Sequence, residues 1–416
     1  MQVFNLESKA MECPHAHYRA IQQQEPVHFS QDLGIWLVTS YDLVAEVYEK
    51  PNTFSSSISI GPRGHELYAE MLRMAKESPE LADQVEGYGA TPRNVLLWAD
   101  PPIHTRQRAF VNPTVTPAKV RRYEDRFAAI AHDLVAKFVE SGSVEFISQF
   151  ARPYTMRCIA ELLGLPDEVE RLGIWSGDFM RALVGDPPTS EELKELAKSR
   201  LDFDMFFTNL IEERRGSDGD DLISQLTQTR KDGALEIDEM LPMIQQMLVG
   251  GNETSASNLA NTMIRLAEDG ALFERVAADK TLIPALLEEV LRAETPGQMN
   301  YRLATEDAEL GGKTIRAGDV VCVVMGATGH DPAEYTNAHE LDLGRPKIRH
   351  HQAFGWGPHV CVGQHFARLE MRVALEALMA NLADLRLSKG EPNPVYARSA
   401  TMHGPTSVNF EFTQRV

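Results

Sequence analysis

Residues 354–370 read Phe354-Gly355-Trp356-Gly357-Pro358-His359-Val360-Cys361-Val362-Gly363-Gln364-His365-Phe366-Ala367-Arg368-Leu369-Glu370. A single cysteine, Cys361, lies in this glycine-rich loop, and a helix-forming run begins near Gln364. Glycine accepts backbone conformations that a β-carbon forbids, so the loop can lie close to a large flat group. The positive end of the following helix favours the thiolate form of the cysteine, which is the form that binds metals. The stretch therefore predicts a metal-binding loop, although a cysteine taken at random is more often an ordinary buried residue.

The same loop resembles the haem-thiolate loop of the cytochrome P450 family, which reads Phe-Gly-x-Gly-x-His-x-Cys-x-Gly and leads into an Ala-Arg-x-Glu helix. The resemblance implies that Cys361 is the metal ligand, binding the iron of haem b, and that it takes part in catalysis. It also implies that Phe354, Gly355 and Gly363 lie against the cofactor. A match of this length is far more specific than an isolated pair of cysteines.

Apolar residues recur at helical spacing from about residue 238 to residue 269, which predicts a helix long enough to cross the molecule. Its middle reads Gly250-Gly251-Asn252-Glu253-Thr254. Glycines inside a helix cost on the order of 1 kcal/mol each, so they indicate close helix packing, a kink, or a groove on the helix surface. The segment resembles the oxygen-activating helix of the cytochromes P450. That resemblance implies that Glu253 and Thr254 are catalytic and deliver protons for cleavage of the O–O bond.

Residues 98–108 begin a helix that sets His104 and Arg108 four positions apart, on one face. Such a pair by itself is also expected on a solvated basic surface. However, the run Asp-Pro-Pro-x-His-Thr-Arg-x-Arg closely resembles the P450 helix whose His and Arg bind the haem propionates. The resemblance extends to Arg302 and to His359, so four side chains are expected to hold the propionates. Arginine suits this task because it can bind a carboxylate through two parallel hydrogen bonds.

Glu289 and Arg292 are three positions apart on a predicted helix. Most pairs with this spacing, such as Glu212 and Arg215, are surface ion pairs that contribute about 0.2–0.5 kcal/mol. The position of the first pair upstream of the cysteine loop resembles the Glu-x-x-Arg motif of the cytochromes P450. The resemblance implies a buried structural pair and no catalytic role.

The composition is typical of a globular chain and argues against nucleic-acid and membrane roles. The chain has 416 residues, of which 43% are hydrophobic, and a formal net charge of −19. Phosphate binding would need an excess of Lys and Arg. No apolar run reaches about 18 residues, and the first residues do not resemble a signal peptide. The four cysteines lie far apart, which argues against disulfides and a cysteine-rich zinc site and predicts a cytoplasmic location.

The order of elements predicts a predominantly α fold with small β-sheets, a single-domain cytochrome P450 fold over residues 1–416. Helices are expected from residue 117 to about 138, at 153–163, 238–269 and 282–293, and on both sides of a break at 185–188. Strands are expected in a hairpin at 26–40 and at 299–304, 313–315, 320–325, 397–400 and 407–412. The irregular stretch 54–91, with a helical insert near 67–74, is interpreted as a lid over a pocket.

The resemblance implies a haem-thiolate monooxygenase that inserts one oxygen atom of O2 into a hydrophobic small organic substrate. Electrons are expected from NAD(P)H through a ferredoxin reductase and a ferredoxin. An axial thiolate suits this chemistry because it donates electron density that promotes O–O cleavage. Two alternatives are a peroxide-driven haem-thiolate peroxygenase, which the Glu253 and Thr254 pair disfavours, and a haem sensor or electron carrier.

The resemblance also places a substrate pocket against several separated segments. Its apolar candidates are Leu96, Leu97, Phe179, Leu183, Val249 and Met299, and its polar candidates are Asn252, Gln298 and Asn300. Core packing explains any one of these residues equally well. The sequence does not identify the substrate.

Five basic residues are expected on the cysteine side of the cofactor: Arg106, Lys347, Arg349, Arg368 and Arg372. On a chain with a net charge of −19, such a cluster would attract an acidic ferredoxin. The alternative is a solvated basic rim without a partner.

Overall fold

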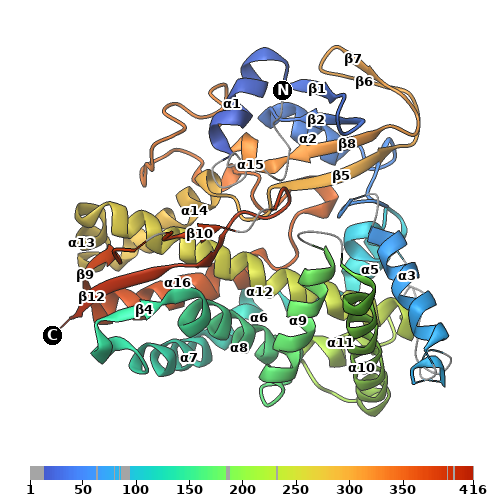
Figure 1. Ribbon diagram of the computed structural model, residues 1–416, viewed down its shortest axis with the longest axis horizontal. Coiled ribbons are helices and arrows are strands. Elements are labelled where there is room, and N and C mark those ends of the chain that lie inside the picture. Colours follow the sequence, from blue (N-terminus) through green and yellow to red (C-terminus); the bar gives the residue numbers. More distant parts are fainter. Residues whose placement is uncertain are drawn as a thin grey trace.

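The computed structural model of the protein describes residues 14–61, 64–78, 80–83, 85, 94–183, 188–230, 233–390, 392–396 and 399–415. Most of these residues are helical, and within these ranges the strands form four small sheets. Figure 1 shows the strands β1, β2, β5 and β8 gathered at one side of the molecule, while helices fill the other side. The predicted fold class, mainly helical with small sheets, is confirmed.

The helices have the following bounds: α1 His15–Gln24, α2 Tyr41–Glu49, α3 Gly64–Glu77, α5 Ile103–Val111, α6 Pro117–Val120, α7 Glu124–Ala136, α8 Arg152–Leu163, α9 Val169–Leu183, α10 Ser190–Arg214, α11 Leu222–Leu226, α12 Ile237–Glu268, α13 Gly270–Ala278, α14 Ile283–Ala293, α15 Met325–Thr328 and α16 Gln364–Asn381.

The strands are β1 Val27–Ser30, β2 Ile35–Val38, β3 Phe54–Ser55, β4 Ser143–Glu145, β5 Met299–Ala304, β6 Ala308–Leu310, β7 Lys313–Ile315, β8 Val320–Val324, β9 Leu382–Leu387, β10 Val395–Tyr396, β11 Pro405–Ser407 and β12 Asn409–Gln414. The largest sheet has the order β1-β2-β8-β5-β3, and only β2 and β8 in it run parallel. β1 and β2 form the hairpin that the sequence predicted. The other sheets are β4-β12-β9 and the pairs β6-β7 and β10-β11.

Helix α12 runs through the centre of the molecule (Figure 1) and is buried over most of its length. Its first turn is closed by a capping box between Glu236 and Glu239. The helix contacts α8, α9, α14 and α16, and its apolar side chains belong to the same core as theirs. The predicted helix is confirmed, and it stays helical through Gly250 and Gly251.

The helix predicted from residue 117 is divided into two. α6 ends at Val120, a single tight turn covers Arg121–Tyr123, and α7 begins at Glu124. The division arises because the backbone tightens to three residues per turn at this point. The predicted core positions hold, since Phe127, Leu134 and Phe138 are all buried.

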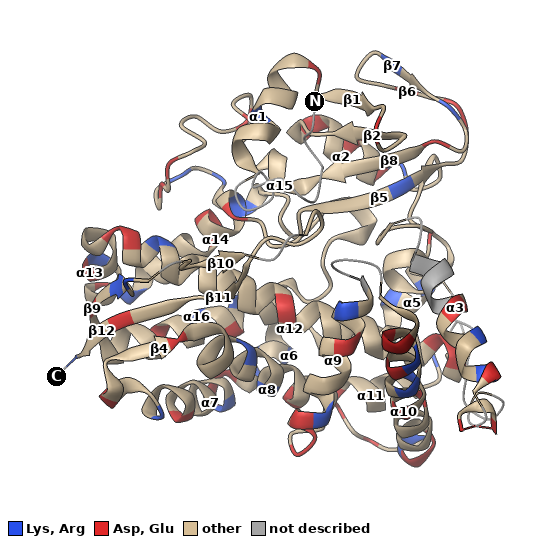
Figure 2. Ribbon diagram, in the orientation of Figure 1, with Lys and Arg blue, Asp and Glu red and all other residues tan. Residues whose placement is uncertain are grey.

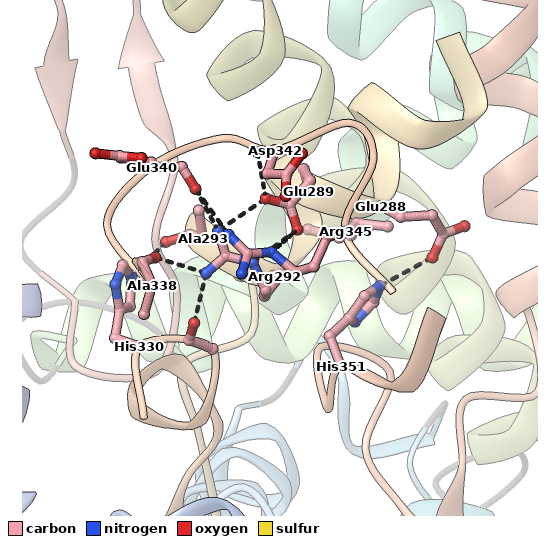
Figure 3. A network of polar contacts seen from close by, with 12 residues as sticks. Glu288, Glu289, Arg292, Ala293, His330, Ala338, Glu340, Asp342, Arg345 and His351 are labelled. Carbon is pink, nitrogen blue, oxygen red and sulfur yellow. Dashed lines mark hydrogen bonds and ion pairs between the residues drawn. The ribbon is translucent and has the colours of Figure 1, made fainter. Parts of the chain in front are cut away.

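A buried polar network ties the segment before the cysteine loop to α14 (Figure 3). The guanidinium of Arg292 donates to both carboxylate oxygens of Glu289, at 2.8 and 3.0 Å, and both side chains are fully buried. It also donates to the carbonyls of Gly329 and Ala338, at 2.5 and 2.7 Å. The carbonyl of Arg292 lies so close to Gly329 that a β-carbon there would clash with it. The predicted buried pair is therefore confirmed.

The predicted lid is described in part. The helical insert is confirmed as α3, which packs against α10 through an apolar cluster that includes Met71, Ala75 and Leu196. Residues 62–63, 79, 84 and 86–91 of the predicted lid lie outside the described residues. So do residues 397–398 of the predicted strand 397–400, while residues 399–400 form no strand.

Charged residues of both signs are interspersed on the helices, most visibly along α10 (Figure 2). Such mixing limits the local field that the net charge of −19 creates. Among the described residues, no helix is both long enough and apolar enough to cross a membrane.

Candidate active site

Backbone hydrogen bonds close the loop that carries Cys361. The N–H of Cys361 donates to the carbonyl of Phe354 at 2.7 Å, and the N–H of Val360 donates to the carbonyl of Gly357 at 3.1 Å. Gly357 has a φ of +63°, and a β-carbon there would lie 2.9 Å from the carbonyl oxygen of Tyr48 in α2. Glycine is therefore needed both for the left-handed backbone and for the close approach of α2.

The thiol of Cys361 lies between this loop and the first turn of α16. Burial raises the pKa of the thiol, while the N–H groups of Gly363 and Gln364 and the charges of Arg108 and Arg368 lower it. Burial is the larger influence, so the net shift is upward. Four groups that favour negative charge nevertheless surround one sulfur. This environment suits a thiolate whose charge is shared with a metal ion.

A cavity of about 310 Å³ lies beside the thiol. One wall is a single face of α12: Gln246, Met247, Gly250, Gly251, Thr254, Ser255 and Asn258. Another wall is the cysteine loop with the start of α16: Ala353, Phe354, Gly355, His359, Cys361, Val362, Gly363, Phe366, Ala367 and Glu370. The two most specific sequence motifs therefore face the same cavity.

The two adjacent glycines of α12 serve different purposes. A β-carbon on Gly250 would meet no atom within 4 Å, so this glycine widens the cavity. A β-carbon on Gly251 would lie 2.7 Å from Cδ1 of Ile159, so this glycine lets α8 approach α12 closely. The groove and the close packing that the sequence left as alternatives are both present.

Thr254 and Glu253 are neighbours in sequence but point in different directions. Thr254 lines the cavity, and its hydroxyl donates to the carbonyl of Gly250 at 2.7 Å. Glu253 is absent from the cavity lining, and its carboxylate lies 3.1 Å from the guanidinium of Arg152 on α8. The structure therefore brings the predicted alcohol to the cavity, but it does not bring the predicted acid there.

Basic side chains from α5 and the cysteine loop border the cavity. The ring centroids of His104 and His359 lie 4.0 Å apart, and Nε2 of His359 lies 3.0 Å from the hydroxyl oxygen of Ser56. Nη1 of Arg108 donates to the carbonyl of Val360 at 2.8 Å. Burial lowers the pKa of His104 to about 4 and that of His359 to about 3, and neighbouring cations add to both shifts. Both rings are therefore neutral at pH 7.

Arg302 on β5 is 1% exposed and absent from the cavity lining, but it is close enough to His104 and His359 for its charge to lower the pKa of both rings. Its Nη1 donates to the hydroxyl of Ser59 at 3.0 Å and to the carbonyl of Tyr301 at 2.8 Å. Its buried Nη2 has no hydrogen-bond partner among the described residues. An unpaired buried guanidinium nitrogen is costly, so this atom indicates a place for an anionic ligand.

A family model described as Cytochrome P450 matches residues 184–412 of this chain. The chain belongs to the cytochrome P450 family. It is 31% identical over 399 residues to 6-deoxyerythronolide B hydroxylase of Saccharopolyspora erythraea, a match that covers 93% of each protein.

Solved structures of this family have the same fold. Cytochrome P450 CYP109Q5 from Chondromyces apiculatus aligns with a TM-score of 0.83 and 28% identity, over 99% of this chain and 98% of that one. CYP109E1 from Bacillus megaterium, in complex with corticosterone, aligns with a TM-score of 0.82 and 28% identity, over 97% of this chain and 99% of that one. This cytochrome P450 is therefore an oxidoreductase of the monooxygenase class, with haem b as its cofactor.

The residues around the cavity of this cytochrome P450 fit haem b. The thiol of Cys361 is a suitable axial ligand for haem iron. The unpartnered nitrogen of Arg302 suits a propionate carboxylate, because hydrogen bonds between charged groups are the stronger ones. The predicted neighbours Phe354, Gly355 and Gly363 all line the cavity.

Three of the predicted substrate-pocket residues, Leu96, Leu97 and Asn300, line the cavity of this cytochrome P450. The side chain of Leu183 lies outside the described residues. The other predicted residues, Phe179, Val249, Asn252, Gln298 and Met299, are absent from the lining.

Packing explains where these other residues lie. The ring of Phe179 packs edge-to-face on Phe203, with centroids 5.2 Å apart. The amide oxygen of Asn252 accepts a hydrogen bond from the hydroxyl of Thr155 at 2.7 Å, so it faces α8. Met299 belongs to an apolar cluster beneath α1. For these three side chains, the core-packing alternative describes their surroundings.

Gln246 and Glu370 are among the polar residues of the cavity wall that sequence reasoning missed. Gln246 accepts from the N–H of Leu97 and donates to the carbonyl of Val95, each at 3.1 Å, so it fastens that segment to α12. Glu370 is fully buried, and burial raises the pKa of its carboxyl well above the ordinary value, opposed by the hydroxyl of Ser255. Both residues could have been found, because Gln246 lies four positions before Gly250 and Glu370 ends the quoted motif.

Proposed function

We propose that this cytochrome P450 hydroxylates a hydrophobic small organic molecule, using O2 and electrons from NAD(P)H that arrive through a ferredoxin reductase and a ferredoxin. The observation that carries the proposal is the shared cavity. The thiol of Cys361 and the face of α12 with Gly250 and Thr254 border the same space. The cavity is therefore lined by a metal-ligand sulfur, that of Cys361, and by the hydroxyl of Thr254, and it leaves space for a small molecule beside Gly250.

Cys361 is proposed as the residue whose sulfur would hold the haem iron. The N–H groups of Gly363 and Gln364 and the cations of Arg108 and Arg368 support it by favouring negative charge on the sulfur. When bound, haem b supplies the activation of O2, and an axial thiolate promotes cleavage of the O–O bond. The protein contributes the sulfur, the shape of the cavity and the exclusion of water.

His104, Arg108, Arg302 and His359 are the proposed propionate-binding residues. The support is their common location and the unpartnered Nη2 of Arg302. Arg302 is a cation that no carboxylate pairs with among the described residues. A propionate would supply the missing negative charge.

Thr254 and Glu253 are proposed to manage proton delivery. The hydroxyl of Thr254 borders the cavity, where it can hold and pass a proton. Glu253 must act from the α8 side, where Arg152 holds it. The acid is therefore proposed as the outer member of the route and the alcohol as the inner member.

A hydrophobic substrate is supported by the lining and by the relatives. Leu96, Leu97 and Met247 contribute apolar surface, while Asn300 is a polar group that can orient a substrate. One similar protein hydroxylates 6-deoxyerythronolide B, and a similar structure holds corticosterone. We therefore propose a hydrophobic small organic substrate for the present chain.

The proposed ferredoxin surface contains fewer basic residues than the five that the sequence analysis predicted. Four of the five pair with carboxylates of the same chain: Arg106 with Glu239, Arg368 with Glu288, Arg372 with Glu124 and Glu376, and Arg349 more loosely with Glu288, at 3.8 Å. Lys347 and Arg349 are exposed. We propose that these two contribute most to the attraction of an acidic ferredoxin.

We propose that residues 1–416 form a single haem domain that works in the cytoplasm. One core cluster joins residues from Val95 to Phe412, and the sheet that holds β1 also holds β8. The three described cysteines, Cys158, Cys322 and Cys361, are free thiols, which a reducing compartment preserves.

The test of the proposed function replaces Cys361 with histidine and uses Cys322→Ala as the matched control. Cys322 is also free but is buried in β8, away from the cavity. The wild type and the control should give the strongly red-shifted absorption of a reduced carbon-monoxide complex and hydroxylate a bound substrate, and Cys361→His should do neither. Retention of band and activity in Cys361→His would refute the ligand assignment.

The electron route is tested by reconstitution with NAD(P)H, a ferredoxin reductase and a ferredoxin. Product should depend on all three components. Product formed equally well with hydrogen peroxide alone would favour the peroxygenase alternative, and no product from any hydrophobic ligand would favour the sensor alternative. Lys347→Glu with Arg349→Glu should slow reduction at low salt more than Arg372→Glu does, and added salt should remove the difference.

A further inference from the structure

Three metal-ligating side chains meet outside the cavity, from three distant parts of the chain. His15 begins α1, Glu294 follows the last residue of α14, and His403 lies between β10 and β11. Nε2 of His15 and Nε2 of His403 each lie 3.2 Å from the same oxygen, Oε2 of Glu294. None of the three residues lines the cavity beside Cys361.

Two of the three spacings between the ligand atoms match a tetrahedral metal site. All three atoms lie within 4.8 Å of one another. Zinc binds histidine nitrogen at about 2.0–2.1 Å and carboxylate oxygen at about 2.0–2.2 Å, so two ligand atoms at a tetrahedral angle lie about 3.3 Å apart. The two observed N···O distances of 3.2 Å are close to this value. The Nε2 atoms of both rings are therefore already at ligand spacing from the carboxylate oxygen.

The three side chains are buried, and two of them are fixed by neighbours, which favours a preformed site. Their side chains are 12%, 8% and 5% exposed, in the order His15, Glu294 and His403. Arg265 on α12 pairs with Oε1 of Glu294, which leaves Oε2 to face the two rings. The ring of Tyr396 stacks on that of His403, with centroids 5.1 Å apart and an interplanar angle of 8°. The ion pair and the stacked ring restrain Glu294 and His403, whereas Nδ1 of His15 is buried without a hydrogen-bond partner among the described residues.

Two further groups border the three proposed ligands. The ring centroid of His330 lies 4.3 Å from that of His15. Arg265 is the nearby positive charge, and it pairs with the other oxygen of Glu294, Oε1, so the ion would approach Oε2.

We propose that His15, Glu294 and His403 bind a divalent transition-metal ion of the zinc type. The ion is separate from the haem iron, and an open fourth position is left for water. A set of two imidazoles and one carboxylate is a zinc ligand set found in proteins. Without the ion, both rings donate hydrogen bonds to one carboxylate oxygen, and the experiment below separates these two states.

The ion would stabilise the segment around Pro296 and Gly297, which forms part of the wall of the active-site cavity. The N–H of His403 donates to the carbonyl of Pro296 at 2.7 Å, and the N–H of Gln298 donates to the carbonyl of Thr401 at 2.8 Å. Pro296 and Gly297 line the cavity. Metal binding would therefore fasten α1 and the turn at 399–404 to the segment that forms this wall, and it would stabilise the fold without taking part in the chemistry.

The proposal is tested by titrating zinc chloride into the haem-loaded protein, after removal of any affinity tag and treatment with a chelator. Calorimetry should show one zinc ion bound per chain and a rise in the thermal midpoint of unfolding. His15→Gln and His403→Gln should each lower the zinc affinity by at least about tenfold. The matched control is His339→Gln, because His339 is 64% exposed and pairs only loosely with Glu340 at 3.6 Å. The control should bind zinc as the wild type does.

A wild type that binds no zinc would overturn the proposal, as would equal affinity in the wild type and in both ligand variants. If the variants fail to fold, zinc K-edge X-ray absorption of the wild type decides the question. A first shell of nitrogen and oxygen with imidazole scattering is expected at about 2.0–2.1 Å. A first shell that contains sulfur, or one that lacks imidazole, would assign the ion to another part of the chain and refute the site.

Discussion

The carboxylate of Glu253 lies 3.1 Å from the guanidinium of Arg152, and this ion pair joins α12 to α8. The side chain of Arg152 is 47% exposed, so the pair is close to the molecular surface. The next residue, Thr254, borders the cavity and donates to the carbonyl of Gly250. The proposed proton route therefore has one member at the surface and one at the cavity, and each can be tested separately.

Thr254→Ala should uncouple electron use from product formation. The substitution removes the hydroxyl at the cavity but leaves Cys361 and the basic residues in place, so haem content and ligand affinity should change little. Consumption of NAD(P)H should continue, with a larger share of the electrons appearing as hydrogen peroxide. Product and peroxide formed per NAD(P)H oxidised are the measurements. Unchanged coupling would mean that the hydroxyl serves only its hydrogen bond to Gly250.

Glu253→Gln should slow the whole catalytic cycle, because an acid that can shuttle protons is lost. Arg152→Gln is the matched control, since it breaks the same ion pair and keeps the acid. The pair is partly exposed, so its loss should change the free energy of unfolding by no more than about 1 kcal/mol. If Glu253→Gln turns over slowly and Arg152→Gln turns over at the wild-type rate, the effect comes from loss of the proton-carrying acid. Equal slowing in both variants would assign it to the ion pair.

The sequence predicted the motif on α12, but it did not by itself give the direction of each side chain, which follows from the helical spacing. Positions 246, 250, 254 and 258 recur every four residues and share the cavity face. Asn252 and Glu253 lie on other faces of the same helix. Helical spacing alone would have separated Thr254 from Glu253 and added Gln246 to the site.

Other features depend on tertiary contacts that a sequence pattern does not contain. The role of Gly251 is set by Ile159, which lies in another helix. The burial of Glu289 and Arg292 follows from carbonyls far along the chain, and the exposed pair of Glu212 and Arg215 has the same spacing. The cysteine loop was predictable because its motif is contiguous in the sequence, whereas the contact between Gly357 and α2 was not.

Arg302→Leu should accelerate the loss of haem. A hydrogen bond to a charged group contributes about 1.5–3 kcal/mol, so the rate should rise roughly 10- to 100-fold. Transfer of haem to an excess of apomyoglobin measures this rate. Ser59→Ala removes the partner of Nη1 and leaves the unpartnered Nη2, so it should have a smaller effect. Arg316→Gln, on the surface beside Asp307, is the control. Equal rates for Arg302→Leu and this control would remove Arg302 from the proposed propionate site.

Glu288→Gln should destabilise the fold at neutral pH. The carboxylate is 3% exposed and accepts hydrogen bonds from His351 at 2.9 Å and from Arg368 at 2.6 and 3.0 Å (Figure 3 shows the histidine). Burial alone would raise its pKa, but these bonds lower the pKa from 4.5 to about 2. The difference corresponds to about 3 kcal/mol of stability.

The pH dependence of this contribution has a definite sign. The contribution is complete above pH 4.5, the ordinary pKa, and is lost as the pH falls toward 2, because the unfolded chain takes up a proton more readily than the folded chain. Chemical unfolding at pH 7 should show the loss in Glu288→Gln, and the gap to the wild type should narrow in acid. Glu212→Gln, at a surface pair of 51% exposure, should lose no more than about 0.5 kcal/mol. A constant gap at all pH values would contradict the argument.

Gly250→Ala and Gly251→Ala should have different effects on stability, although the two residues are adjacent. Alanine is better than glycine in a helix by about 1 kcal/mol, and a β-carbon on Gly250 meets no atom within 4 Å. Gly250→Ala should therefore raise the free energy of unfolding. A β-carbon on Gly251 would lie 2.7 Å from Cδ1 of Ile159, and overpacking of this kind costs about 1–3 kcal/mol. Gly251→Ala should therefore be neutral or destabilising.

Ile159→Val tests whether the overlap with Ile159 causes the effect of Gly251→Ala, because valine lacks the Cδ1 atom. On its own it should cost about 0.5–1.5 kcal/mol. Combined with Gly251→Ala, it should relieve the overlap, so that the double variant is more stable than the sum of the two single effects by about 1 kcal/mol or more. Combined with Gly250→Ala, the effects should simply add. Urea unfolding of the haem-loaded proteins measures all five variants, and additive effects for Gly251 and Ile159 would show that the contact between α8 and α12 does not require glycine at position 251.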